Sequence, residues 1–586
     1  MPTPGPAHET TSTPPARPPV PSPRPAPDGT PPAGYRGSRA ERARFPLAPE
    51  VVRETAVTCG VCVRPVALRV TDRRSGRSSF VDVPCGATLA VKCPVCADRA
   101  RRLRVWQCRE GWHLDRDPLP EPDPPTAGQV ALVVERADLT AARDELHDLG
   151  DDLSTAAAQE SLDEVDALLR RSGVRGTVEP PARARRARST RRRQDVPDLP
   201  RRPMTSTTLG RVFTDARTGQ VFRPSLFLTV TLPSYGRVRS DGTPVDPGSY
   251  DYVRAGRDAL HFGKVLDRLV QNLRRVAGYD LQYFAVVEPQ RRLAAHAHFA
   301  IRGTLPRALI RQVIRATYHH VWWPPTGPVL YGPDRAPVWD PCSGPDGRGG
   351  FVDPDTRVPL RTWNQALDHL DALGDQARPA HVIRLGDQCD VQGLLAGSPE
   401  ADRRIGYLTK YLTKNMGDTH DTATPAQKAH ARRLAETVAA EPCSPSCPCW
   451  LHYGIQPRNA RADMTPTSCR SRAHKPEHLG YPGRRILVSR KWSGKTLTDH
   501  RTDRRRHVLN TLGLDPDAVG DKTRHHHHWE RARPDHIPPL GHRLLRAIAR
   551  RHQWRTAYRA ARDSGPPSGA GPVRVECSAT GPGGAG

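Results

Sequence analysis

The chain has 586 residues, including 61 prolines and 47 glycines, and only 37% of its residues are hydrophobic. This composition indicates that much of the chain lies outside a packed core. Lys and Arg number 89 against 62 Asp and Glu, so the formal net charge is +27. A positive charge of this size predicts a polyanionic partner, most often nucleic acid, and disfavours small-molecule dehydrogenases and enzymes of acidic substrates.

The N-terminal segment lacks the apolar stretch of a signal peptide, and no run of about 18 apolar residues predicts a transmembrane helix. We therefore expect a soluble, cytoplasmic protein with no membrane partner. In that compartment thiols stay reduced, so the 13 cysteines predict metal ligands before disulfides.

Residues 1–50 are rich in proline and predict a disordered leader. Residues 51–120 form a cysteine-rich module, and residues 121–204 form a helical insertion followed by an arginine-rich linker. Within the insertion, leucines at near-helical spacing over 136–172 predict an acidic helix pair, broken near Gly150. Seven arginines between residues 183 and 193 are typical of a solvated linker that also contacts phosphates.

The first cysteine cluster contains two Cys-x2-Cys pairs. Cys59 and Cys62 form the first pair, and Cys93 and Cys96 form the second. Paired knuckles of this kind commonly fold a small ribbon around one tetrahedral zinc ion, which makes this module zinc-ribbon-like. Further ligands stand nearby and would permit a second ion: Cys85, Cys108 and His113. The alternative is a set of free buried thiols, which the dense spacing disfavours.

Residues 205–420 contain the strand and helix patterns of an α+β domain. Segments 226–232, 282–288 and 296–303 are typical of strands, whereas 260–276, 306–323 and 402–416 have apolar residues at helical spacing. The order strand, helix, strand, strand, helix predicts a central antiparallel sheet flanked by helices. Residues 324–380, rich in Gly, Pro and Asp, interrupt this pattern and are interpreted as an insertion.

Two histidines and a glutamate in this domain predict a metal site. His296 and His298 alternate along one strand, so both imidazoles face the same side of the sheet. If the two neighbouring strands form a hairpin, Glu288 lies beside them and completes a three-ligand face with open positions. Such a face suits Mg²⁺ or Mn²⁺, and the ligand types do not choose between the two ions.

The segment from Tyr407 to Lys414 places two tyrosines and two lysines on neighbouring positions of a predicted helix. Tyr407 and Tyr411 are four residues apart and share a face, with Lys410 and Lys414 alongside. A lysine near a phenol favours the phenolate that attack on a phosphodiester requires. The alternative is an ordinary amphipathic helix with core tyrosines and solvated lysines.

Residues 440–500 predict a second zinc module with a basic segment. Three cysteines come first, Cys443, Cys447 and Cys449, and three further ligands follow, Cys469, His474 and His478. Only two of the first three cysteines are needed, and the spacing does not say which pair binds. Five basic residues predict contacts with the DNA backbone: Arg484, Arg485, Arg490, Lys491 and Lys495. The stretch 489–496 only partly matches a nucleotide-binding P-loop, and residues 501–586 predict a basic, largely disordered tail.

Together, the segment 227–232, the His296–His298 pair and the tyrosine–lysine helix resemble the three motifs of the His-hydrophobe-His (HUH) endonuclease superfamily. Their chain order, with the tyrosines last, is that of rolling-circle replication initiators rather than of conjugative relaxases. The segments 318–325, 406–414, 450–457 and 477–500 are further similar to replication initiators of actinobacterial plasmids and integrative conjugative elements. The resemblance covers about residues 51–500. One departure is Leu293-Ala294 after Arg292, where relatives often carry glycine.

The resemblance implies that Tyr411 or Tyr407 attacks a phosphodiester at a replication origin, forms a 5′-phosphotyrosine and frees a 3′-hydroxyl for synthesis. Some one-tyrosine relatives carry an acid at the place of Tyr407, which favours Tyr411 as the initiating nucleophile. Single- and double-stranded origin DNA would be the substrate, zinc would be structural, and a host helicase and replication machinery would be partners. The alternatives are a relaxase or transposase of the same chemistry, or a non-catalytic, zinc-dependent DNA-binding regulator.

Overall fold

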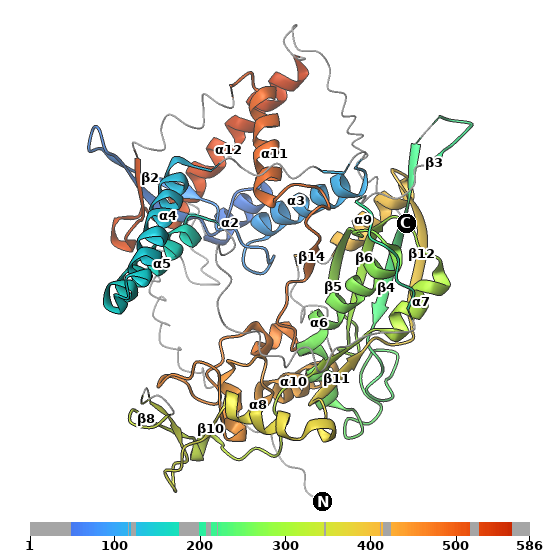
Figure 1. Ribbon diagram of the computed structural model, residues 1–586. Coiled ribbons are helices and arrows are strands. Elements are labelled where there is room, and N and C mark those ends of the chain that lie inside the picture. Colours follow the sequence, from blue (N-terminus) through green and yellow to red (C-terminus); the bar gives the residue numbers. More distant parts are fainter. Residues whose placement is uncertain are drawn as a thin grey trace, which may run out of the picture. The chain divides into compact units, whose positions relative to one another are not determined.

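The computed structural model describes residues 49–114, 117–118, 125–174, 199–206, 213–219, 221–344, 347, 349–410, 412–413, 424–515 and 527–564. The chain divides into two compact units (Figure 1). We call residues 101–501 the central unit, and residues 1–100 with 502–586 the terminal unit. The predicted leader and the arginine-rich linker lie outside the described residues, apart from the first and last few positions of those segments.

The central unit is organised around an antiparallel sheet. Its strands are β4 (Val221–Thr231), β5 (Tyr283–Pro289), β6 (Ala295–Arg302), β12 (Cys389–Ala396) and β14 (Ile486–Val488), in the order β12-β4-β6-β5-β14. The short β3 (Phe213–Thr214) also pairs with β4. Every pairing is antiparallel, which confirms the sheet type predicted for this domain.

Strand β4 shows how the sequence assigns the two faces of this sheet. Leu226, Leu228 and Val230, at alternate positions, are buried in the main core with the apolar face of α6 (Tyr252–Ala277). Ile310 and Val313 of α7 (Arg307–Ala316) join the same core.

The opposite face of the sheet packs against a different helix. Phe227 of β4 belongs to a second core with Ile405 and Leu408 of α9 (Pro399–Thr409). The sheet is therefore covered by α6 and α7 on one side and by α9 on the other.

Two predicted helices end earlier than expected. The helix expected over 306–323 stops at Ala316, and β7 (Tyr318–Val321) follows and pairs with β11 (His381–Arg384). Aromatic and β-branched side chains in this run favour the extended backbone over continued helix. The helix expected over 402–416 spans Pro399–Thr409, with Ser398 as its N-cap.

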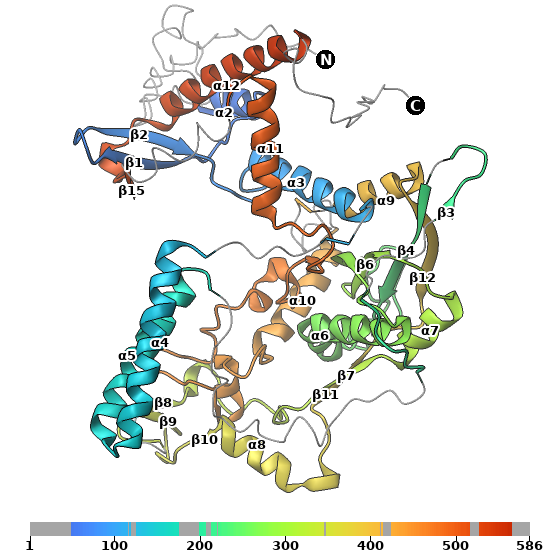
Figure 2. The ribbon, with the colours of Figure 1, turned by 45° about the horizontal axis from the view of Figure 1, so that its top comes forward.

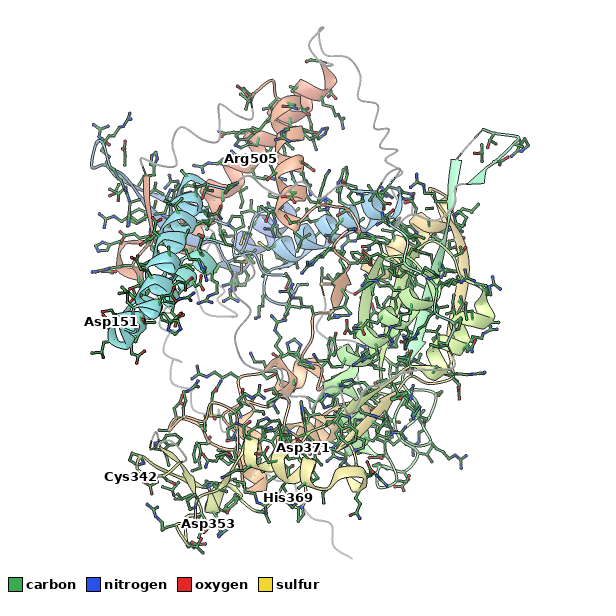
Figure 3. All side chains as sticks on the ribbon, viewed as in Figure 1. Asp151, Cys342, Asp353, His369, Asp371 and Arg505 are labelled. Carbon is green, nitrogen blue, oxygen red and sulfur yellow. The ribbon has the colours of Figure 1, made fainter. Side chains whose placement is uncertain are left out.

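The segment 324–380 is not an isolated insertion. It contains β8 (Val338–Asp340), β9 (Gly350–Val352), β10 (Arg361–Thr362) and α8 (Trp363–Ala372), and β10 pairs with β13 (Ile455–Gln456) of the second cysteine module. The rings of Trp363 and Trp450 lie 5.1 Å apart in a shared core. Asp353, labelled in Figure 3, accepts a hydrogen bond from the Tyr331 hydroxyl, and both residues belong to this segment. The α10 helix (Pro425–Ala440) joins this region to α6.

The acidic helix pair is present as predicted. It consists of α4 (Ala127–Asp148) and α5 (Asp152–Arg171), joined through Gly150 at φ 75°. Leu162, Val165 and Leu169 are buried, and Arg136 Nε donates to Asp166 at 2.7 Å. The pair begins nine residues earlier than the pattern indicated, because Thr126 forms a capping box with Gln129.

The terminal unit is built from both ends of the chain. Its sheet has the order β15-β1-β2, with β15 (His527–Arg531) beside β1 (Val66–Asp72) and β2 (Ser78–Val83). The α12 helix (Leu540–Asp563) packs on α2 (Pro49–Thr58). The expectation of a largely disordered tail over 501–586 is thus wrong for the part of α11 (Leu497–Thr511) that lies in it and for residues 527–564, which complete the first cysteine module. Residues 565–586 lie outside the described part.

The remaining elements are α3 (Pro94–Trp112), α11 (Leu497–Thr511) and short 3₁₀ helices at Pro333–Arg335, Gly374–Gln376, Pro448–Tyr453, Arg472–His474, Pro476–His478 and Pro534–His536. Among the described helices, none combines the length and hydrophobicity that a membrane crossing requires.

We predict that Leu544→Ala destabilises the terminal unit by about 2–5 kcal/mol, because Leu544 is 2% exposed in the core shared with α2. Leu545 is 42% exposed, so Leu545→Ala is the matched control and should change stability little. Hydrogen-exchange mass spectrometry of residues 52–63 measures this unit separately. Equal protection in the two variants would contradict the packing of α12 described above.

Candidate metal and nucleotidyl-transfer site

The structure brings Glu288, His296 and His298 together on one face of the central sheet. Glu288 lies directly opposite His296 across the β5–β6 pair, as the predicted hairpin requires. One ligand atom from each of the three residues lies within 4.8 Å of the other two. Their side chains emerge on the α9 side of the sheet, since His298 packs against Phe227 of that face.

The nitrogen atoms of the two histidines are arranged as a cation would require. His296 Nε2 and His298 Nε2 face each other at 2.9 Å. Within the described part of the chain, the buried Nδ1 of His296 has no hydrogen-bond partner. On the other ring, Nδ1 of His298 lies 2.9 Å from Thr229 Oγ1, which orients the imidazole so that Nε2 points to the centre of the group. This donor set fits a divalent cation.

Burial changes the protonation of all three groups, in favour of cation binding for the two histidines and against it for Glu288. It lowers the pKa of His296 to about 3, with His298 adding to the effect, and lowers the pKa of His298 to about 4. Both imidazoles are therefore neutral near pH 7 and can donate a lone pair. Burial also raises the pKa of Glu288 to about 7, although Arg485 and Lys410 oppose this rise.

Tyr407 places a phenol beside the three-residue group. Its hydroxyl lies 3.3 Å from His298 Nε2, and its ring meets the His298 ring edge-on at 5.0 Å. The side chain is nevertheless 42% exposed, so a DNA strand can reach it. Lys410 follows as the C-cap of α9 and is exposed. Tyr411 and Lys414, the second tyrosine and second lysine of the predicted segment, lie outside the described residues.

Two residues that the sequence analysis did not single out contribute to the site. Thr229 orients His298, and Arg404 lies 5.1 Å over the Phe227 ring and helps to lower the pKa of His298. Arg404 stands three residues before Tyr407 on α9, so the helical period carried a signal for its position. Thr229 occupies the same face of β4 as Phe227, which the strand alternation also indicates.

The basic residues assigned to DNA contact fall into different environments. Arg485 lies beside the metal-ligand group and donates to the Val287 carbonyl, while Arg484 and Arg490 are exposed on either side of β14. Lys491 is half-buried, and Lys495 pairs with Glu110 at 2.7 Å.

The P-loop-like stretch 489–496 is occupied by internal contacts. The Ser489 hydroxyl is hydrogen-bonded to the backbone N–H and carbonyl of Tyr283. Trp492 is fully buried, and Ser493 Oγ lies 3.1 Å from His500 Nε2. Nucleotide binding there remains disfavoured, and the stretch serves to anchor β14 at the edge of the sheet.

In the terminal unit, four cysteines come together: Cys62, Cys85, Cys93 and Cys96. Three of them belong to the predicted knuckles, but Cys85 stands in place of Cys59. The reason is local, because the N–H of Cys59 still donates to the Thr55 carbonyl in the last turn of α2. The Cys85 N–H, in turn, donates to Cys62 Sγ at 3.3 Å. This four-thiol group can bind zinc.

In the second module, the group consists of Cys443, Cys447, Cys469 and His474. Of the alternatives left open by the spacing, Cys449 turns its thiol to the Ala439 carbonyl and His478 lies outside the group. Although burial alone would lower the pKa of His474, hydrogen bonds with Cys443 and Cys469 raise it to about 10. This Cys₃His set can also bind zinc.

The sequence matches the family described as "RepSA: Replication initiator protein, pSAM2" over residues 48–550. The chain belongs to this replication initiator family. No curated protein and no solved structure matches it. The match extends into α12, so the replication initiator family includes both ends of the terminal unit as well as the central sheet.

Family membership gives the protein its role, which is the initiation of plasmid replication, and origin DNA as its partner. It confirms the resemblance to plasmid replication initiators. The strong positive charge of the chain, +27, agrees with a DNA partner.

We predict that Mn²⁺ binding to this replication initiator weakens about tenfold between pH 8 and pH 6. The pKa of Glu288 is raised to about 7, so its carboxylate, present at pH 8, is mostly protonated at pH 6, whereas both histidines stay neutral. Isothermal titration calorimetry with Mn²⁺ measures the change. In Glu288→Gln the affinity should be low at both pH values, and a tenfold pH effect surviving in that variant would assign the titration to another group.

We predict that Cys85→Ser and Cys469→Ser each reduce the zinc content by about one ion per chain, because each removes a thiol from one of the two groups. Cys59→Ser and Cys449→Ser are the matched controls, since neither belongs to a group, and both should retain full zinc. Inductively coupled plasma mass spectrometry gives the content. Zinc loss in a control with retention in its partner variant would reverse the ligand assignment.

Proposed function

We propose that this replication initiator is an HUH-type endonuclease and strand transferase that nicks one DNA strand at the origin through a tyrosine. The observation that carries the proposal is the Tyr407 hydroxyl, 3.3 Å from His298 Nε2, beside a three-residue group that suits a divalent cation. Nucleophile and cation site thus come from α9 and the sheet, as the resemblance to the superfamily implies.

Glu288, His296 and His298 would hold Mg²⁺ or Mn²⁺. When bound, the cation supplies charge that polarises a phosphate oxygen and lowers the barrier to attack. The chain's own contribution is to hold the two histidines neutral and oriented, with Thr229 fixing His298. Arg485, at the edge of the group, adds a positive charge for the phosphate.

In the proposed step, the phenol oxygen forms a bond to phosphorus and the bond from phosphorus to the 3′ oxygen breaks. The phenol proton passes to solvent, which the exposed Tyr407 side chain permits, and the departing 3′ oxygen takes up a proton. The products are a 5′-phosphotyrosine and a free 3′-hydroxyl, which can prime synthesis. Lys410, three residues further on at the C-cap of α9, would stabilise the phenolate that attacks.

The position of Tyr407 bears on the choice between the two tyrosines. Sequence reasoning favoured Tyr411 as the initiating nucleophile, with Tyr407 in the place of an acid. We propose instead that Tyr407 initiates, because its hydroxyl is already beside the cation group while its side chain stays accessible. Tyr411 would then cleave the regenerated junction after one round and release a circle.

A relaxase or transposase would use the same chemistry on other DNA ends. The family match to plasmid replication initiators favours the origin. A non-catalytic regulator would leave the Tyr407–His298 contact without a role. A host helicase would separate the strands ahead of synthesis.

The decisive experiment is a covalent-adduct assay. Full-length protein is mixed with Mn²⁺ and single-stranded fragments tiling the DNA around its gene, and is then run on a denaturing gel. We expect a metal-dependent protein–DNA band that falls by at least about 100-fold in Tyr407→Phe and in His296→Ala. Tyr453→Phe, a tyrosine outside the site, should leave the band unchanged.

The outcomes separate the candidates. A band lost in Tyr411→Phe and kept in Tyr407→Phe would return the initiating role to Tyr411. If no fragment yields a band while duplex fragments still bind, the nicking proposal fails and the regulator takes its place.

A further inference from the structure

The outer face of α12 is strongly basic. The helix contains seven arginines and a single acidic residue, Asp563. Its apolar side is used internally, since Leu544, Ala547 and Ile548 pack into the core of the terminal unit. Arg543 Nε donates to Asp82 of β2 at 2.8 Å and fixes the start of the helix. The remaining arginines are displayed by a helix whose position is already determined.

Two arginines from different helices meet at the end of α2. Arg99 of α3 donates from Nη2 to the Gly60 carbonyl at 2.6 Å. Nη2 of Arg555, from α12, comes so close to Gly60 that a Cβ there would lie 3.2 Å from it. Gly60 has φ 70°, a left-handed conformation that glycine adopts without strain, and so lets both guanidinium groups approach the backbone.

Two more arginines join this pair. The pKa of Arg551 is lowered by partial burial and then by three positive charges, those of Arg99, Arg555 and Arg504. Arg504 belongs to α11, and Figures 1 and 2 both show the C-terminal part of that helix beside α12. Arg505 extends from the same helix (Figure 3). Arg99, Arg504, Arg551 and Arg555, which we call the arginine cluster, are all exposed.

Like charges near one another repel, and this repulsion is one of the causes that lower the pKa of Arg551. A polyanion removes that repulsion, and a row of DNA phosphates is the polyanion that a replication initiator meets. The α12 helix has 24 residues and is therefore about 36 Å long, close to one turn of B-form DNA at about 34 Å. A rigid rod of that length matches the fixed phosphate spacing of a duplex better than a flexible single strand.

We propose that the arginine cluster and the outer face of α12 bind the phosphate backbone of duplex DNA. This inference deepens the proposed function, because an origin has to be held as duplex before one strand is nicked. It does not depend on cleavage, since the cluster belongs to the terminal unit and Tyr407 belongs to the central unit.

The test is fluorescence anisotropy of full-length protein with a 30-base-pair duplex of mixed sequence, without added Mg²⁺ or Mn²⁺, over a range of salt concentrations. The triple variant Arg504→Ala/Arg551→Ala/Arg555→Ala should bind at least about tenfold more weakly at low salt. Its slope of log affinity against log salt should fall by about 3, because each lost phosphate contact removes about 0.9. Binding of a 30-nucleotide single strand should change much less.

A matched control removes the same charge elsewhere. Arg335, Arg432 and Arg461 each pair with a carboxylate of their own surroundings, so their triple alanine variant should keep the wild-type slope. The triple lysine variant of the three mutated cluster residues should retain most of the affinity. If alanine abolishes folding, seen as loss of zinc, single Arg551→Ala should still lower the slope by about 1.

Equal slopes in the cluster and control variants would overturn the proposal, and so would an equal loss of single-strand binding. Failure of the nicking proposal gives a different pattern. No covalent adduct would then form in wild-type protein, while the duplex-binding difference between the two triple variants would persist.

Discussion

The antiparallel register of β4, β6 and β5 is the constraint on which the site depends. It places His298 opposite Thr229 on one side and His296 opposite Glu288 on the other. Because side chains alternate along a strand, a shift of one residue in either pairing would turn the ligands into the apolar core beneath α6. Core packing by alternating residues such as Leu228 and Val230 therefore fixes the geometry of the cation group.

Much of this arrangement could be predicted from the sequence because it depends on the spacing of side chains along single strands and helices. The alternation of His296 and His298, the hairpin that returns to Glu288 and the helical spacing around Tyr407 are all readable without contacts. The same holds for the acidic helix pair, whose leucines and capping residues lie within one segment.

What could not be read from the sequence depends on partners far apart in the chain. Cys85 replaces Cys59 because the end of α2 carries Cys59 out of the group, a matter of helix termination rather than of ligand spacing. Segment 324–380 looked like an insertion, yet Trp363 packs on Trp450 in the second cysteine module. Likewise, β14 joins the central sheet although its basic flanks suggested only a DNA-contacting segment.

The closure of the terminal unit by β15 and α12 has a consequence for biosynthesis. Its sheet and its core stay incomplete until residues 527–563 have left the ribosome, whereas the strands of the central sheet are complete by residue 488. The central sheet can thus fold first, while the unit carrying the arginine cluster assembles last. A chain terminated early would keep the tyrosine and its cation group but lack α12, so only finished molecules would combine both units.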